Sequence, residues 1–161
     1  MDATILYPSP LGDIRLTVRG GALAEAHFCR PGDPAPVCRE DPLLDQAARW
    51  LDRYFAGDRP GPGAIPLAPA GTPFQRAVWQ LLREIDYGQS TTYGALARTL
   101  MQRQGLSAMS AQAIGGAVGR NPIAVFIPCH RVLGKNGQLT GYAAGLDRKE
   151  YLLRLEQIPF S

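Results

Sequence analysis

Ile127-Pro128-Cys129-His130-Arg131-Val132 is the segment around which the rest of this chain is organised. An apolar run over residues 123–127 leads into it and a glycine-rich turn over 134–137 follows, so we expect a buried strand that ends at the cysteine. A cysteine acts as a nucleophile in its thiolate form, which a nearby base or positive charge favours. The histidine and the arginine place both kinds of group within two residues of the sulfur. The stretch therefore indicates a reactive thiol.

Three roles remain open for Cys129 on these residues alone. A lone buried cysteine is most often inert. A metal site would need more ligands, but the other histidine and the other two cysteines lie far away in the sequence and fit no standard zinc spacing, so we expect no metal. A nucleophile would need a base and a group that orients it. His130 and Glu156 are the candidates, and because neighbouring side chains on an extended chain point apart, His130 would act through a water or a turn.

The composition of the chain excludes several classes of protein. With 161 residues, 45% of them hydrophobic, the chain can form one domain or two small ones with a buried core. No apolar run approaches the roughly 20 residues of a membrane span, and residues 1–4 do not begin a secretory signal, so we expect no membrane association. Three cysteines cannot all pair, which favours the reducing cytoplasm.

Charge is distributed unevenly along the chain. Residues 1–70 contain 7 Lys+Arg and 9 Asp+Glu, a net charge of −2, whereas residues 71–161 contain 10 and 5, a net charge of +5. The positive half also contains Cys129. A basic surface favours a polyanion such as nucleic acid, although ordinary scatter of charges would give the same totals.

The first half predicts a small α/β subdomain. Residues 4–28 contain three short β-type runs, and Gly20-Gly21 joins the last two as a hairpin turn, which predicts a three-stranded antiparallel sheet. A helix with an apolar face is expected over about 42–55, and residues 57–72, with four prolines and four glycines, form the expected linker. The chain therefore divides into two expected subdomains, 1–70 and 71–161.

The second half predicts mainly helices. They are expected over about 73–85, 93–100 and 110–118, with a last helix from about 146. The middle pair, joined by residues 101–109, suggests a helix-turn-helix unit. Four residues share one face of its second helix, Gln112, Gly115, Gly116 and Gly119. Since each glycine costs a helix about 1 kcal/mol, either a close approach to a nucleic-acid groove or tight packing against another helix, with Gly119 as the C-cap, should compensate.

The motifs of the second half resemble those of a known family. Pro128-Cys129-His130-Arg131-Val132, with Asn121-Pro122 before it and Gly141-Tyr142 and Leu152-Leu153-x-x-Glu156 after it, resembles the O6-alkylguanine-DNA alkyltransferase family. Further matching segments are Gly71-Thr72-Pro73-Phe74-Gln75, Val78-Trp79, Tyr87-Gly88, Thr92-Tyr93 and Ala113-Ile114-Gly115-Gly116-Ala117. The resemblance is dense over 71–158 and looser over 1–70, where Tyr54-Phe55-Ala56-Gly57 is typical of bacterial members.

The resemblance implies a fold and a reaction. A ribonuclease-H-like α/β subdomain would precede a mainly helical, winged-helix-like subdomain whose helix-turn-helix enters the minor groove of double-stranded DNA. An alkylated guanine would be flipped into a pocket. The cysteine would take the alkyl (methyl) group from guanine O6, or from O4-alkylthymine, irreversibly and without a cofactor, so each molecule would act once. A monomer that can cluster on DNA, with no obligate protein partner, would suffice.

The resemblance also assigns roles to residues. Cys129 would be the alkyl acceptor, deprotonated through a water by His130, which Glu156 would orient. Tyr93 would donate a proton or hydrogen bond to the guanine ring, and Asn121 would brace the turn before the acceptor. Arg131 would form an ion pair beside the site. The positions expected at the DNA or the substrate are Thr92, Ala111, Gln112, Gly115, Gly116, Arg120, Arg131, Tyr142 and Ala143.

Two features depart from the family's pattern. Gln112 stands where the family usually has an arginine that fills the gap left by the flipped base, which predicts weaker DNA binding or slower extrusion. The connection over 99–109 is several residues longer than usual, which would alter backbone contacts through Arg103.

Other functions fit the sequence less well. A lesion-binding, alkyltransferase-like protein without chemistry would usually have tryptophan at the position of the acceptor cysteine. A transcriptional regulator built on the same domain would need an additional metal-binding, methyl-sensing domain, for which 161 residues leave no room. A cysteine hydrolase would need an oxyanion hole, which no motif specifies.

Overall fold

The computed structural model describes residues 2–161, over which the chain folds as two units. Unit 1 comprises the residues up to Ala70 together with Pro122–Phe126, and unit 2 comprises Gly71–Asn121 and Ile127–Ser161. The chain first passes from unit 1 to unit 2 in the proline- and glycine-rich linker. The return of residues 122–126 to unit 1 is not predicted from the sequence, which assigns them to the second half.

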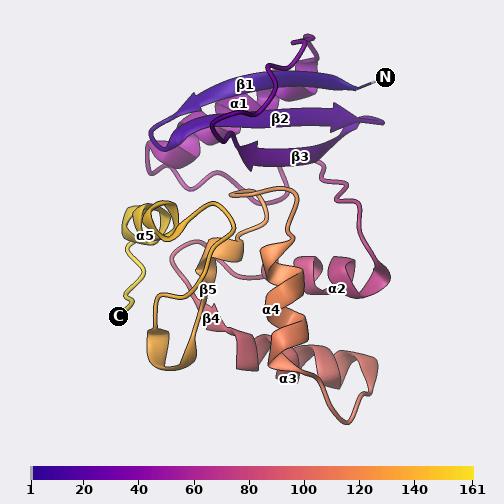
Figure 1. Cartoon of the computed structure of the whole chain (residues 1–161), viewed down its shortest axis with the longest axis vertical. Coiled ribbons are helices and arrows are strands. Elements are labelled where there is room, and N and C mark those ends of the chain that lie inside the picture. Colours follow the sequence, from indigo (N-terminus) through magenta and orange to yellow (C-terminus); the bar gives the residue numbers. More distant parts are fainter. Residues whose placement is uncertain (1) are drawn as a thin grey trace. The chain divides into compact units, whose positions relative to one another are not determined.

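An antiparallel sheet and a helix form most of unit 1 (Figure 1). The strands are β1 (Ala3–Ser9), β2 (Gly12–Arg19) and β3 (Ala22–Phe28), paired in the order β1-β2-β3. The helix α1 (Pro42–Phe55) contacts all three strands, and the side chain of Asp41 caps its first turn by accepting a hydrogen bond from Leu43 N at 2.8 Å. Its face toward the sheet is fully buried at Leu44 and Leu51. The predicted three-stranded sheet and helix are confirmed.

Two further segments bond to the outer edge of β3. Leu23 N donates to Pro66 O at 2.8 Å, and Ala26 N donates to Pro122 O at 2.9 Å. The ring of Phe126 stacks on Trp50 with centroids 4.5 Å apart. An exposed strand edge would leave backbone groups unpaired, so these segments complete the sheet.

The strand expected over 123–127 is wrong. Ile123 makes a single bridge to β3, and residues 124–126 form a turn in which Val125 has a positive φ of 70°. Ile123, Val125 and Ile127 are nonetheless almost fully buried. A short apolar run predicts burial, but it does not distinguish a strand from a buried turn.

Unit 2 is mainly helical, as predicted (Figure 1). Two parallel two-residue strands pair within it, β4 (Thr91–Thr92) and β5 (Val132–Leu133). Its helices and 3-10 turns are α2 (Pro73–Leu82), α3 (Tyr93–Gln104), α4 (Ala111–Gly119), η1 (Cys129–Arg131), η2 (Lys135–Gly137) and α5 (Leu146–Leu155).

The helix-turn-helix pair differs from the expected one in a single respect. α3 continues to Gln104 rather than ending near residue 100, so much of the long connection is helix, which Gly105 ends with a φ of 66°. Arg103 at this end makes a bidentate ion pair with Glu84, at 2.7 and 2.6 Å. The packing of α2 on α4 includes a hydrogen bond from Trp79 Nε1 to Ala117 O at 2.8 Å.

The last residues of the chain pack back onto unit 2. Leu153 of α5 and Ile158 are buried with Leu133, and Leu139 and Phe160 cover this cluster. Ser161 is bonded on both sides, because its N–H donates to Gly137 O at 2.9 Å and its carbonyl accepts from Leu139 N at 2.8 Å. Among residues 2–161, no helix has the length and apolar character that a bilayer crossing requires.

Candidate active site

Cys129 lies at the first position of the 3-10 turn η1, not at the end of a strand. Its thiol is buried, and the side-chain amide of Asn121 holds the turn in place. Asn121 Nδ2 donates to Ile127 O at 2.8 Å and to Cys129 Sγ at 3.1 Å. A residue that precedes the turn therefore positions both the backbone before the cysteine and the sulfur atom itself. Because the backbone is coiled here, the alternation of an extended chain does not apply to Cys129 and His130.

Glu156, directly after α5, connects the two residues that follow Cys129. His130 Nε2 lies 2.5 Å from Glu156 Oε2, and Arg131 Nε donates to Glu156 Oε1 at 2.7 Å. The backbone N–H of Gly88 donates to the same carboxylate at 3.1 Å. His130 and Glu156 are each at most 1% exposed. The partner that the sequence requires for a buried Glu156 is thus a pair of side chains from η1.

The charges of this group follow from its burial and its contacts. Burial alone would raise the pKa of Glu156, but the hydrogen bonds and charges of His130 and Arg131 lower it to about 2. Burial lowers the pKa of His130, and the Arg131 charge opposes the effect of Glu156. We therefore assign an anionic Glu156 and a neutral His130 near pH 7. In that state His130 Nε2 donates to the carboxylate, and Nδ1 is the ring nitrogen that can accept a proton.

The thiol itself is protonated at rest. Burial raises the pKa of Cys129, and four interactions act against this rise: the hydrogen bond of the Asn121 amide, the positive charge of Lys149, the Tyr142 hydroxyl and a backbone hydrogen bond at Cys129 itself. A thiol of this kind needs a base before it can react. The neutral histidine beside it has the required protonation state.

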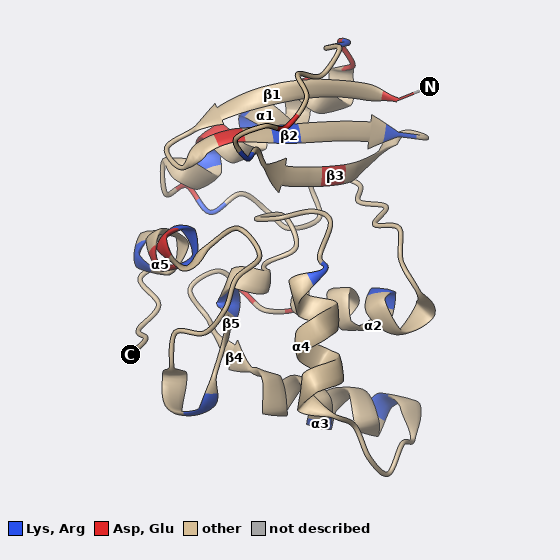
Figure 2. Ribbon diagram, in the orientation of Figure 1, with Lys and Arg blue, Asp and Glu red and all other residues tan. Residues whose placement is uncertain are grey.

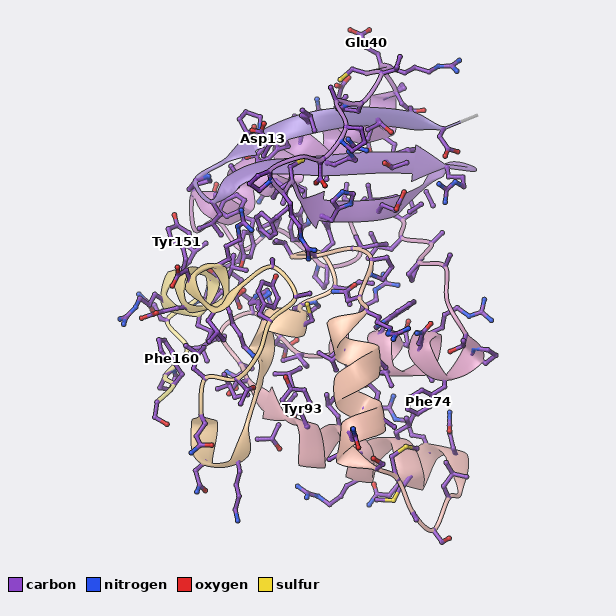
Figure 3. The ribbon with its side chains drawn as sticks, viewed as in Figure 1. Asp13, Glu40, Phe74, Tyr93, Tyr151 and Phe160 are labelled. Carbon is purple, nitrogen blue, oxygen red and sulfur yellow. The ribbon has the colours of Figure 1, made fainter. Side chains whose placement is uncertain are left out.

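Cys129 opens onto a pocket of about 290 Å³. The residues that line it come from the start of α3, one face of α4, η1 and the loop before α5; they are Tyr93, Gly115, Val118, Gly119, Cys129, Gly141, Tyr142 and Ala143. Figure 3 labels Tyr93 at the start of α3, and its hydroxyl accepts a hydrogen bond from Thr140 Oγ1 at 3.4 Å. The lining is mostly apolar with two phenol groups, which suits a flat ring that carries polar edges.

The glycine-rich face of α4 has little to pack against within unit 2. A Cβ built on Gly116 or Gly119 would meet nothing within 4 Å, and one on Gly115 would meet only the Tyr93 ring at 3.9 Å. Close packing against another helix, one of the two interpretations left open by the sequence, therefore does not explain Gly116, and the C-cap expected at Gly119 is Arg120. The remaining interpretation is a helix face without side chains, which an external partner can approach closely.

The other predicted residues fall into two groups. The first group is exposed and lies on α4 or directly after it: Ala111, Gln112 and Arg120. Figure 2 shows basic segments on α2, on α3 and directly after α4, and no acidic segment on α3 or α4. Two others have roles inside the protein. Thr92 Oγ1 caps α3 by accepting from Ala95 N at 3.1 Å, and Arg131 is 9% exposed, with Glu156 as its ion-pair partner.

Lys149 is a site residue that the sequence reading missed. Its side chain is fully buried in unit 2, and its charge acts on the thiol. The available signal was its position in α5, since Lys149 precedes Glu156 by seven residues, about two helical turns, and so shares its face. Among residues 2–161, no cluster of three His, Cys, Asp or Glu side chains could hold a metal ion.

Both units match domains of one family. Residues 4–69 match the ribonuclease-like domain of 6-O-methylguanine DNA methyltransferase, and residues 73–158 match the DNA binding domain of 6-O-methylguanine DNA methyltransferase. A methylated-DNA–protein-cysteine methyltransferase of Haemophilus influenzae is 42% identical over 158 residues, covering 96% of this chain and 86% of the relative.

Solved structures give the same result. A variant of the Mycobacterium tuberculosis O6-methylguanine methyltransferase is similar to this chain with a TM-score of 0.81 and 34% identity, covering 100% of this chain and 97% of that one. The structure of Mycobacterium tuberculosis OGT in complex with DNA is similar with a TM-score of 0.79 and 38% identity, covering 97% and 92%.

Proposed function

The chain belongs to the 6-O-methylguanine DNA methyltransferase family, and we propose that Cys129 is its methyl acceptor. The protein repairs DNA by direct reversal, since it transfers the methyl group of O6-methylguanine in DNA to one of its own cysteines. The observation that carries the assignment to Cys129 is the placement of this buried thiol in the wall of a pocket, beside a neutral histidine held by an anionic glutamate.

Four side chains of the site would carry out the transfer: Cys129, His130, Glu156 and Tyr93. Glu156 holds the His130 Nε2–H, so Nδ1 takes the thiol proton through a bridging water. The thiolate then attacks the methyl carbon, the S–C bond forms, and the C–O6 bond breaks with its electron pair passing to guanine. Tyr93 donates a proton or hydrogen bond to the ring as this charge develops. The thiol loses one proton and the guanine gains one, so the step is balanced and leaves a stable thioether.

The helix pair α3 and α4 would hold double-stranded DNA. The net charge of +5 over residues 71–161 favours the phosphate backbone. The open face at Gly116 and Gly119 would let α4 enter a narrow groove, with Ala111 beside it. Gln112 would take the space that the flipped base leaves, and Tyr142 and Ala143 would contact the alkyl group.

The chain would work as a monomer. One chain contains the thiol, the base and the pocket lining, so the reaction needs no second protein. A reducing cytoplasm would keep the acceptor thiol reactive, and the cysteines at positions 29, 38 and 129 are all free.

A stoichiometric transfer assay tests this assignment. Incubated with duplex DNA that contains radiolabelled O6-methylguanine, the protein should take up one equivalent of label and then stop. Cys129→Ser should take up none, whereas Cys38→Ser, which changes an exposed cysteine of unit 1, should behave as the unmodified protein does. Label on Cys129→Ser, or label released as a small product, would contradict the assignment. The same experiment separates the transferase from a lesion-binding protein without chemistry, which would bind the duplex and take up no label.

A further inference from the structure

Lys149 is a buried ammonium group in unit 2 with no carboxylate among its hydrogen-bond partners. Its side chain is 0% exposed. Nζ donates to three backbone carbonyls, Val132 O at 2.6 Å, Thr140 O at 3.1 Å and Gly141 O at 3.4 Å. An ammonium group has three donors, so these carbonyls satisfy all of them. Because the carbonyls are neutral, the hydrogen bonds leave the positive charge of Lys149 uncancelled.

This arrangement differs from the other buried cation of the site. Arg131 is paired with the Glu156 carboxylate, and their charges offset one another. A buried cation without a counter-ion is costly, and a chain that needed only to fill the space could place an apolar side chain there. The chain contains two lysines and fifteen arginines, so a lysine at a fully buried position is also unusual within this sequence.

The carbonyls that hold Lys149 belong to two parts of the site. Val132 starts β5, directly after η1. Thr140 and Gly141 belong to the loop that lines the pocket, and Thr140 Oγ1 donates to the Tyr93 hydroxyl. The ammonium group therefore links the backbone that follows the acceptor to the pocket wall and, through Thr140, to Tyr93.

The positive charge of Lys149 acts on Cys129 and His130, the first two residues of η1. It lowers the pKa of Cys129 and of His130, and burial lowers the pKa of Lys149 itself to about 8, against the opposing effect of Cys129. The Tyr142 hydroxyl also interacts with the thiol, and burial raises the pKa of Tyr142 well above its ordinary value. Lys149 is thus the cation whose charge favours the thiolate.

We infer that Lys149 is a positioning residue for methyl transfer: its uncancelled charge stabilises the Cys129 thiolate, and its three hydrogen bonds hold the pocket loop against β5. This inference rests on the proposed role of Cys129 as acceptor. It assigns the electrostatic part of thiol activation to α5, in addition to the proton transfer assigned to His130.

The first test measures the thiol without DNA. Iodoacetamide alkylation of Cys129 is followed by mass spectrometry as a function of pH, in the unmodified protein and in Lys149→Met. Loss of the charge should raise the pKa of Cys129, so that alkylation and methyl transfer at pH 7 both slow by about tenfold or more. Lys135→Met, which removes the exposed lysine of η2, should leave the profile unchanged. An unchanged thiol profile in folded Lys149→Met would overturn the inference while leaving the acceptor assignment intact.

The second test does not depend on the folding of a Lys149 variant. Isotope labelling of lysine gives two side-chain NMR signals, one from Lys149 and one from Lys135, which serves as reference. The Lys149 signal should titrate with a midpoint near 8, and Cys129→Asp should raise that midpoint, because a carboxylate at this position favours the ammonium form as the thiolate would. A midpoint that Cys129→Asp does not change would show that the two positions are not coupled and would reject the inference.

Discussion

The two units of this chain bury different kinds of side chain. In the described part of unit 1 the buried side chains are apolar except for Thr17, whereas unit 2 buries His130, Arg131, Lys149 and Glu156. Apolar burial stabilises a fold at about 25 cal/mol per Å², while a buried charge stabilises it only if its partners are complete. The buried side chains of unit 1 therefore stabilise the fold without entering the chemistry, whereas the buried charges of unit 2 serve both. Substitutions in unit 1 should change folding alone, and substitutions among the buried charges of unit 2 should change both.

The largest effect is expected from Glu156→Gln. The amide has the same shape but removes the charge that His130 and Arg131 share, which leaves Arg131 uncompensated in the interior. We expect a loss of roughly 3–5 kcal/mol in the free energy of unfolding and a transfer rate at least about 100-fold lower. Denaturant unfolding and single-turnover transfer measure the two effects.

Its control is Glu150→Gln, which breaks an exposed ion pair with Arg154 and should cost only about 0.3–0.5 kcal/mol.

The dependence of stability on acid pH is a second test of the charge assigned to Glu156. The pKa of Glu156 is lowered to about 2 from 4.5, so its contribution is complete above about pH 4.5 and is lost as the pH falls toward 2. Stability should therefore decline across this interval by up to about 3 kcal/mol in the unmodified protein and less in Glu156→Gln. Equal declines would contradict the assigned charge.

Leu51→Ala tests the other side of the comparison. Leu51 is fully buried in unit 1, and its truncation should lower the free energy of unfolding by about 3 kcal/mol. The transfer rate per folded molecule should remain that of the unmodified protein. A rate that falls well below this, measured under conditions in which the variant is folded, would show that the two units are not separable.

Gly116→Ala should have a smaller effect, of opposite sign for folding and for binding. A Cβ at this position meets nothing within 4 Å, so alanine should stabilise α4 by up to about 1 kcal/mol. If this face enters a DNA groove, the added methyl group should weaken duplex binding, measured as the dissociation constant at fixed salt. A variant that is more stable and binds as tightly as before would mean that α4 does not approach DNA by this face.

The smallest effect is expected from Gln112→Arg. An exposed arginine at this position adds a charge and a larger planar group for the gap left by a flipped base. We expect duplex binding and the transfer rate to improve several-fold, roughly 1 kcal/mol. Identical dissociation constants and transfer rates in the two proteins would show that glutamine at this position weakens neither DNA binding nor transfer.

The sequence predicts the chemistry of this site better than its shape. Cys129, His130 and Glu156 can be chosen because few residue types activate a thiol, and the structure brings all three together. The apolar run before Cys129 predicts burial but not the turn it forms, since apolar character alone does not fix backbone conformation. The carbonyls that hold Lys149 come from segments that meet only in the folded unit, so the sequence marks this lysine only by its spacing of seven residues from Glu156.

The bonded position of Ser161 has a practical consequence for engineering. The two backbone hydrogen bonds of the final residue lead to Gly137 and Leu139, directly before the loop that lines the pocket. A purification tag or fluorescent label joined after Ser161 would extend from a residue that supports this loop. Fusions made at the other end of the chain should therefore preserve the measured rates more faithfully, and a cleavable linker would be the safer choice at this one.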